Sequence, residues 1–136
     1  MNFEVNSEME MRELGASLAP SWPAGTLVRL HGELGAGKTT LVRGVLAGLG
    51  YDGGVRSPTF NLVHVYDTVP PVLHADLYRV ATAEGLGLED YLDDHVCLVE
   101  WAERGGPLLE NVPGAVDIRI AFSATGRRVQ IIGPVF

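Results

Sequence analysis

The sequence predicts an α/β fold: a three-layer sandwich around a central, mostly parallel β-sheet, with antiparallel edge strands at the C-terminus. A glycine-rich stretch, "HGELGAGKTT", lies between a segment typical of a strand and a segment typical of a helix. Two later apolar segments, "VLHAD" and "VCLVE", each end in an acidic residue. Near the C-terminus, two alternating segments flank "ATG", which is typical of a β-hairpin. This order of elements favours a largely parallel sheet with helices packed on it.

The first half of the chain is expected to contain two helices and two strands. Residues 7–19 predict a helix, because Ser7 and Glu10 fit a capping box and apolar residues recur on one face. Residues 26–32 predict the strand that enters the glycine-rich stretch. Residues 38–50 predict the helix that leaves it and ends in glycines. After a loop, residues 59–67 alternate enough to predict a second strand.

The second half is expected to consist mainly of strands. Residues 72–76 and 95–101 predict two short apolar strands, separated by a broken helical stretch at 82–94. Residues 102–114 predict a loop with one helical turn. Residues 115–123 and 127–133 predict the two strands of the final hairpin.

The glycine-rich stretch matches a phosphate-binding loop in full. Gly32, Gly35, Gly37, Lys38 and Thr39 fit the pattern G-x-x-x-x-G-K-[ST], after an expected strand and before an expected helix. Glycines let backbone N–H groups turn toward phosphates, and the helix directs its positive end at them. We expect Lys38 to reach the β- and γ-phosphates and the Thr39 hydroxyl to bind Mg²⁺. The predicted nucleotide-binding residues here are Glu33, Leu34, Gly35, Ala36, Gly37, Lys38, Thr39 and Thr40.

These features predict a P-loop NTPase-like fold, with residues 1–136 forming one domain. Hydrophobic residues make up 46% of the chain, which is enough for one core. The apolar runs are too short for a membrane span, and the acidic N-terminus does not resemble a secretory signal. Cys97 is the only cysteine, so no intrachain disulfide is possible, and a cytoplasmic location is expected.

The charge of the chain argues against strong direct binding to nucleic acid. The formal net charge is −7, whereas a free-standing nucleic-acid binder usually carries a basic patch. The basic residues are nearly all arginines spread thinly along the sequence, and Arg127-Arg128 is the only adjacent pair. Lys38 is the only lysine, and it occupies the position where a triphosphate needs a point charge.

A P-loop needs an acid that helps to hold Mg²⁺ or orients the attacking water. Asp76 ends "VLHAD" and Glu100 ends "VCLVE", and ligands of open α/β sheets bind beyond the carboxyl ends of strands. The residues alone do not rank the two acids. Either of them can instead be a strand-end residue that caps a helix or pairs with Arg79 or Arg104.

Two other features have both a functional and a structural interpretation. The "SPTF" segment, with Ser57 and Thr59, follows the helix after the P-loop, where switch segments often lie. A hydroxyl there can contact the γ-phosphate or Mg²⁺, or the segment can be a proline turn that starts a strand. Trp101 follows Glu100 and can pack in the core on the opposite face of the strand, or lie near the nucleotide.

In combination, "GELGAGKTTLVRG", "SPTFNLVHVY", "HADLYRV", "GLEDYL" and "LVEWAER" occur in an order and spacing that resemble the TsaE (YjeE) family. This family consists of bacterial P-loop ATPases of tRNA threonylcarbamoyladenosine synthesis. The resemblance covers most of the chain. The P-loop is shared by many families, but "SPTF", "HxDLYR" and "VEW" together are much more specific.

The resemblance implies ATP and Mg²⁺ as ligands of Lys38 and Thr39. It also implies that Glu100 is the Mg²⁺-associated acid, that Asp76 is important for hydrolysis, and that Thr59 lies near the nucleotide, as Trp101 does in the functional interpretation. The implied activity is weak ATP hydrolysis that supports a complex of TsaD- and TsaB-like partners. That complex transfers threonylcarbamoyl to adenosine 37 of tRNA, so contact with tRNA would be indirect.

Two other functions remain alternatives at this point. A small-molecule P-loop kinase needs an acceptor pocket and an arginine-bearing lid. Arg104, followed by two glycines, is the only lid candidate, and the chain is short for that role. A nucleotide-dependent switch protein is the second alternative, although no N-K-x-D segment that would read guanine is present.

Overall fold

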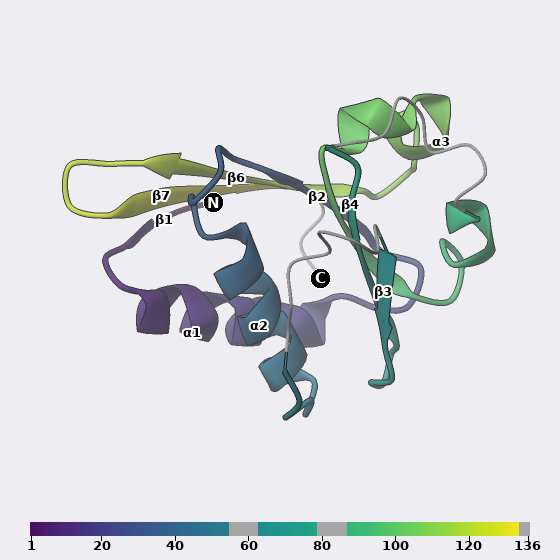
Figure 1. Ribbon diagram of the computed structural model, residues 1–136, viewed down its shortest axis with the longest axis horizontal. Helices are drawn as coiled ribbons and strands as arrows, with labels where there is room; N and C mark the ends of the chain where they lie inside the picture. Colours follow the sequence, from purple (N-terminus) through teal and green to yellow (C-terminus); the bar gives the residue numbers. More distant parts are fainter. Residues whose placement is uncertain (55–62, 79–86, 134–136) are drawn as a thin grey trace.

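The computed structural model describes residues 1–54, 63–78 and 87–133. The order of the elements along the chain is shown in Figure 1. The strands are β1 (Asn2–Val5), β2 (Leu27–His31), β3 (Val63–Tyr66), β4 (Val72–Asp76), β5 (Val96–Glu100), β6 (Val116–Phe122) and β7 (Arg127–Ile132). The α-helices are α1 (Glu8–Leu18), α2 (Lys38–Gly48) and α3 (Pro107–Glu110), and the short 3₁₀ helices are η1 (Ala19–Ser21), η2 (Leu88–Asp90) and η3 (Ala102–Gly105).

The seven strands within the described residues form one sheet in the order β1-β7-β6-β2-β5-β4-β3. The central strands β6, β2, β5 and β4 are parallel to one another. The C-terminal hairpin of β6 and β7 is antiparallel, as predicted, and β1 extends this edge by pairing with β7. At the other edge, β3 pairs antiparallel with β4. The sheet is therefore antiparallel at both edges, whereas the sequence predicted this only for the C-terminal one.

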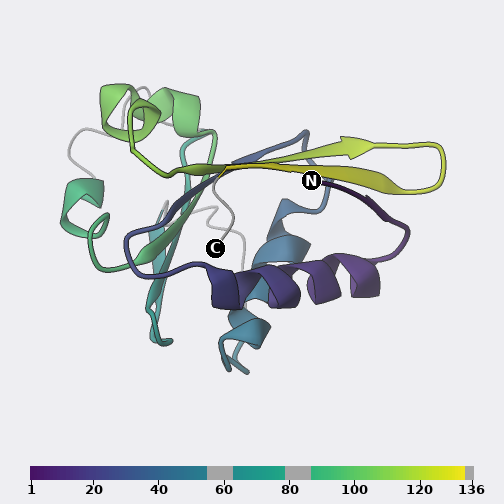
Figure 2. The same ribbon diagram turned by 180° about the vertical axis from the view of Figure 1, so that it is seen from behind.

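Helices α1 and α2, together with η1, cover one face of the sheet, and η2, η3 and α3 lie on the other (Figures 1 and 2). The first core contains Val28, Leu30, Val96 and Leu98 together with residues of α1 and α2. The second core contains the alternate residues of the same strands, such as Leu27, Cys97 and Val99, with Leu88 and Leu109. Because side chains alternate along a strand, even-numbered residues of β4 and β5 face α2. None of the described helices is long and apolar enough to cross a membrane.

The packing of α1 against α2 depends on small residues. An added Cβ at Gly44 would collide with the Arg12 carbonyl, and one at Gly15 would collide with the Leu41 carbonyl. The predicted N-cap of α1 is confirmed, since the Ser7 hydroxyl accepts a hydrogen bond from the Glu10 N–H at 3.1 Å. The Glu10 carboxylate accepts the Asn6 N–H at 2.6 Å. The close packing on α1 fixes α2, and with it the end of the glycine-rich loop.

Candidate nucleotide-binding site

The glycine-rich loop connects β2 to α2 as the sequence predicted. Gly35 and Gly37 have φ angles of 80° and 114°, in the left-handed region that favours glycine. Gly37 is the N-cap of α2, so no capping side chain competes for the N–H groups of the first helical turn. Those N–H groups and the positive end of the helix dipole form an anion-binding geometry. The backbone conformation is therefore compatible with the binding of an anion.

Lys38 is folded back beneath this loop and is only 6% exposed. Its Nζ donates a hydrogen bond to the Gly32 carbonyl at 2.6 Å and lies 3.5 Å from Oε1 of Glu100. Nζ also lies 5.3 Å from the centroid of the Trp101 ring. The only lysine of the chain thus lies at the base of the glycine-rich loop, between the Gly32 carbonyl after β2 and the Glu100 carboxylate at the end of β5.

Glu100, at the end of β5, is 4% exposed and ionised. Burial by itself raises the pKa of this carboxyl, but the hydrogen bond and charge of His74, together with Lys38, outweigh it and hold the pKa below its usual value. The Nε2 of His74 lies 2.7 Å from Oε2 of Glu100. The sequence analysis missed this role of His74. A signal was present, since His74 lies two residues before Asp76 on the same face of β4.

Asp76 and Glu100 are neighbours across the sheet. They are register partners at the carboxyl ends of the parallel strands β4 and β5. The Oδ1 of Asp76 accepts the backbone N–H of Tyr78 at 3.0 Å, which turns the chain at the end of β4. Both acids therefore lie at the sheet edge where nucleotide ligands of such folds bind. Ser57, Thr59 and Arg79 lie outside the described residues.

Trp101 does not continue strand β5. Its φ and ψ angles are 57° and 44°, the left-handed region, and it is the only described non-glycine residue with a positive φ. Its half-buried ring packs against the second core and lies 4.9 Å from the Tyr78 ring and near Lys38. The two interpretations of Trp101 are therefore compatible.

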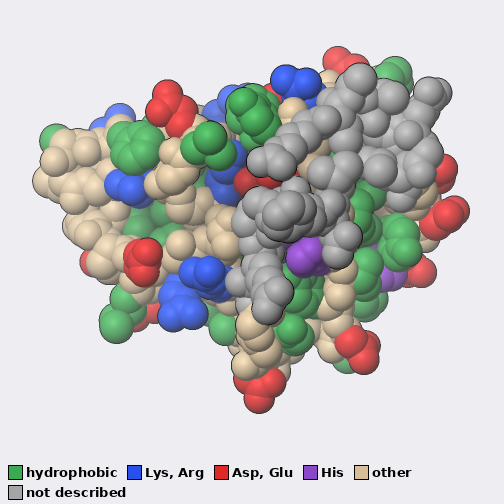
Figure 3. Space-filling model, in the orientation of Figure 1, with side chains coloured by type: hydrophobic (Ala, Val, Ile, Leu, Met, Phe, Trp, Pro, Cys, Tyr) green, Lys and Arg blue, Asp and Glu red, His purple; other side chains and the backbone are tan. Residues whose placement is uncertain are grey.

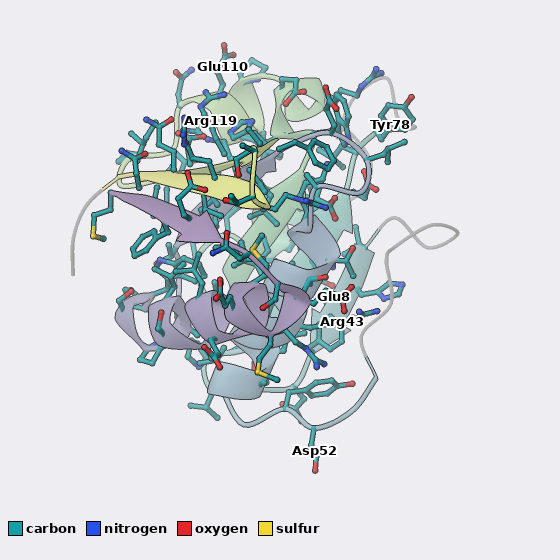
Figure 4. The ribbon with its side chains drawn as sticks, turned by 90° about the vertical axis from the view of Figure 1, so that its left-hand side faces the viewer. Glu8, Arg43, Asp52, Tyr78, Glu110 and Arg119 are labelled. Carbon is teal, nitrogen blue, oxygen red and sulfur yellow. The ribbon has the colours of Figure 1, made fainter. Side chains whose placement is uncertain are left out.

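Figure 4 shows Tyr78 at the opposite end of the view from Asp52, which follows the C-terminus of α2.

A cavity of about 290 Å³ adjoins the loop on the side of α1. It is lined by the end of β1 and the start of α1, by Gly35–Gly37 and Thr40, and by Gly126 and Arg127 of the hairpin. Arg127 donates hydrogen bonds to the carbonyls of Ala36 at 3.0 Å and Gly35 at 3.2 Å. Sequence analysis assigned no role to Arg127, because this contact spans 91 residues and no local pattern announces it.

A metal ion at this site would receive few protein ligands. Within residues 1–54, 63–78 and 87–133, no group of three or more His, Cys, Asp or Glu side chains is suited to hold a metal. Thr39, in the first turn of α2, and Glu100 provide a hydroxyl and a carboxylate. Oxygen donors of this kind suit Mg²⁺, which retains waters and shares one or two protein ligands with phosphates. The donor set therefore fits Mg²⁺ bound together with a nucleotide.

Three comparisons relate the chain to known proteins. Residues 5–130 match the family model "Threonylcarbamoyl adenosine biosynthesis protein TsaE". The protein of Haemophilus influenzae named "tRNA threonylcarbamoyladenosine biosynthesis protein TsaE" is 41% identical, over 78% of this chain and 69% of its own length. The Bacillus subtilis protein of the same name is 37% identical, over 94% of this chain and 87% of its own length. The crystal structure of B. subtilis YdiB is similar in fold, with a TM-score of 0.82 and 31% identity over 98% of this chain and 84% of that one.

Proposed function

The chain belongs to the TsaE family of threonylcarbamoyl adenosine biosynthesis proteins, and we propose that it binds ATP with Mg²⁺ and hydrolyses ATP slowly. The observation that carries this proposal is the buried Lys38, held between the Gly32 carbonyl and Glu100 at the base of the glycine-rich loop. A buried lysine ammonium beside exposed loop N–H groups is suited to an anionic ligand. Its present partners are groups that a triphosphate can replace.

Each residue has a distinct task in this proposal. Lys38 moves from the Gly32 carbonyl to the β- and γ-phosphates, and the loop N–H groups hold the same phosphates. Thr39 and Glu100 hold Mg²⁺, which offsets the charge of the phosphates when it is bound. Asp76, beside Glu100 in the register, orients the attacking water. Thr59 is proposed to lie near the γ-phosphate.

The nucleoside half of ATP has a place next to these groups. The cavity of about 290 Å³ begins at Gly35–Gly37 and Thr40, where the phosphates end, and continues between α1 and the β6–β7 hairpin. Met11 and Val5 give it apolar contacts, and Ser7 and Asn6 give it polar ones. We propose that ribose and adenine bind there, and that Trp101 lies on the phosphate side of the site.

Hydrolysis is proposed to serve a partner complex in the cytoplasm. TsaD- and TsaB-like proteins would carry the threonylcarbamoyl transfer and hold the tRNA, so that this chain contacts tRNA only through them. The net charge of −7 supports this arrangement. On the face seen in Figure 3, the described Lys and Arg side chains are interspersed with Asp and Glu and form no continuous basic patch.

Calorimetric titration tests the proposal. The wild-type protein is expected to bind ATP in the presence of Mg²⁺, and Lys38→Ala is expected to lose nearly all of this affinity. Charge-assisted contacts of this kind are worth about 1.5–3 kcal/mol each. Unchanged ATP affinity in a folded Lys38→Ala variant would exclude the phosphate-site assignment. A separate assay of the products of ATP turnover addresses the alternative function. Phosphorylation of a small acceptor, in place of release of free phosphate, would favour a kinase.

A further inference from the structure

We propose that His74 is a positioning residue for the nucleotide site, and that it acts by holding the Glu100 carboxylate in one orientation. The proposal rests on the function proposed above, because it concerns how Glu100 becomes ready for Mg²⁺. His74 itself is 0% exposed and lies beneath Glu100, so it contacts neither nucleotide nor solvent. Its effect must therefore pass through Glu100.

The strand register brings the two side chains together. His74 is the register partner of Leu98, and Glu100 lies two residues further along β5 on the same face. Diagonal neighbours in adjacent strands are within reach of long side chains. The resulting distance of 2.7 Å between His74 Nε2 and Glu100 Oε2 is that of a charge-assisted hydrogen bond.

The hydrogen-bonding pattern shows that this contact is directed at Glu100. An ionised carboxylate only accepts hydrogen bonds, so His74 must donate from Nε2. The other ring nitrogen, Nδ1, is buried and has no hydrogen-bond partner among the described residues. Among the described residues, Glu100 is therefore the one hydrogen-bond partner of the buried His74 ring. The hydrogen bond from its Nε2 therefore acts on Oε2 of Glu100.

Fixing Oε2 leaves the second oxygen available for a cation. In the structure, Oε1 of Glu100 lies 3.5 Å from the Lys38 ammonium. When Lys38 moves to the phosphates, this oxygen loses its cation and is ready to accept another one. His74 keeps the carboxylate from rotating during this exchange. Hydrogen bonds to ligating carboxylates orient them for the metal, and their loss typically lowers metal affinity by about 10- to 100-fold.

The test measures the Mg²⁺ concentration that half-saturates binding of a non-hydrolysable ATP analogue. His74→Leu is expected to raise this concentration at least about tenfold. His74→Gln, whose amide can replace the Nε2 donor, is expected to remain near the wild type. Val72→Ala, a buried change on the same strand and face, controls for packing and is expected to lower the melting temperature without changing the Mg²⁺ requirement.

A double-mutant cycle isolates the path through Glu100. In a Glu100→Gln background, His74→Leu should add little to the Mg²⁺ requirement, because the carboxylate that it orients is already absent. If His74→Leu does not fold, the pair His74→Gln and His74→Asn replaces it, since the shorter amide loses the contact but keeps the polarity. An unchanged Mg²⁺ requirement in His74→Leu or His74→Asn, or an equal effect with and without Glu100, would overturn the proposal. Failure of the wild type to bind the analogue would instead overturn the proposed function.

Discussion

Arg127 provides the sharpest test of how the C-terminal hairpin supports the candidate site. The perturbation is Arg127→Ala, which removes the guanidinium from the carbonyls of Ala36 and Gly35. Both carbonyls belong to the glycine-rich loop, so the guanidinium restrains the backbone of the loop. With Arg127 absent, the loop is free to sample conformations in which its N–H groups no longer converge.

The magnitude follows from the contacts. Hydrogen bonds from a charged donor are worth about 1.5–3 kcal/mol when well buried, and the exposure of Gly35 reduces this value for one of the two. The guanidinium also lies 4.3 Å from the centroid of the Phe122 ring, and such a contact is worth about 0.5–1 kcal/mol at an exposed site. We expect a net loss of about 1–2 kcal/mol in loop order, which corresponds to about 5- to 30-fold weaker ATP binding.

Arg128→Ala is the matched control. Arg128 is the next residue, carries the same side chain, and forms an exposed ion pair with Glu4, with side chains 66% and 46% exposed. Such pairs contribute about 0–1 kcal/mol to stability, and this one is remote from the loop carbonyls. Calorimetric titration with ATP, together with the melting temperature of each variant, measures both effects. Equal ATP affinities of the two folded variants would refute the reasoning.

Three further outcomes are expected. Glu100→Gln should shift the Mg²⁺ dependence of ATP binding in titrations, because an amide is a poorer ligand for a hard cation. Asp76→Asn should retain ATP binding but lose hydrolysis in phosphate-release assays. The reverse pattern would exchange the roles of the two acids. Burial raises the pKa of the Asp117 carboxyl, but hydrogen bonds from Arg29 and His31 outweigh burial and hold this pKa below its usual value. The stability that Asp117 adds is therefore complete above the ordinary aspartate pKa, and it is lost as the pH falls through the lower pKa of the folded state. Acid unfolding monitored by circular dichroism should therefore be less steep in Asp117→Asn, and an identical acid limb would contradict this. Finally, a TsaD–TsaB-like complex that prefers the ATP state should tighten ATP binding by the same factor and raise the slow hydrolysis rate, and equal partner affinity with ATP analogue, ADP and no nucleotide would rule this out.

The sequence predicted the centre of the fold better than its edges. The loop glycines, the helix after them and the two apolar strands ending in acids are local patterns, and all of them appear where they were expected. Strand β1 was missed because four residues in an acidic segment carry too weak an alternation. The antiparallel pairing of β3 was missed because pairing direction depends on a partner strand and not on composition.

The same division applies to the site. Lys38 and Glu100 were predicted from motif and strand-end position, and the structure brings them within 3.5 Å of each other. His74 and Arg127 were missed because their partners belong to other strands or loops. Only the strand register places His74 beneath Glu100, and only the folded hairpin brings Arg127 to the glycine-rich loop.

The position of β2 also sets an order of events during synthesis on the ribosome. Strand β2 is made early, yet its sheet neighbours β5 and β6 are made much later, and Arg127 reaches the loop later still. A nascent chain that ends before Arg127 carries the whole glycine-rich motif but lacks the contact that orders it. If the loop binds an anion as proposed, the stabilisation that such binding adds is complete only after β7 has been made and Arg127 has reached the loop.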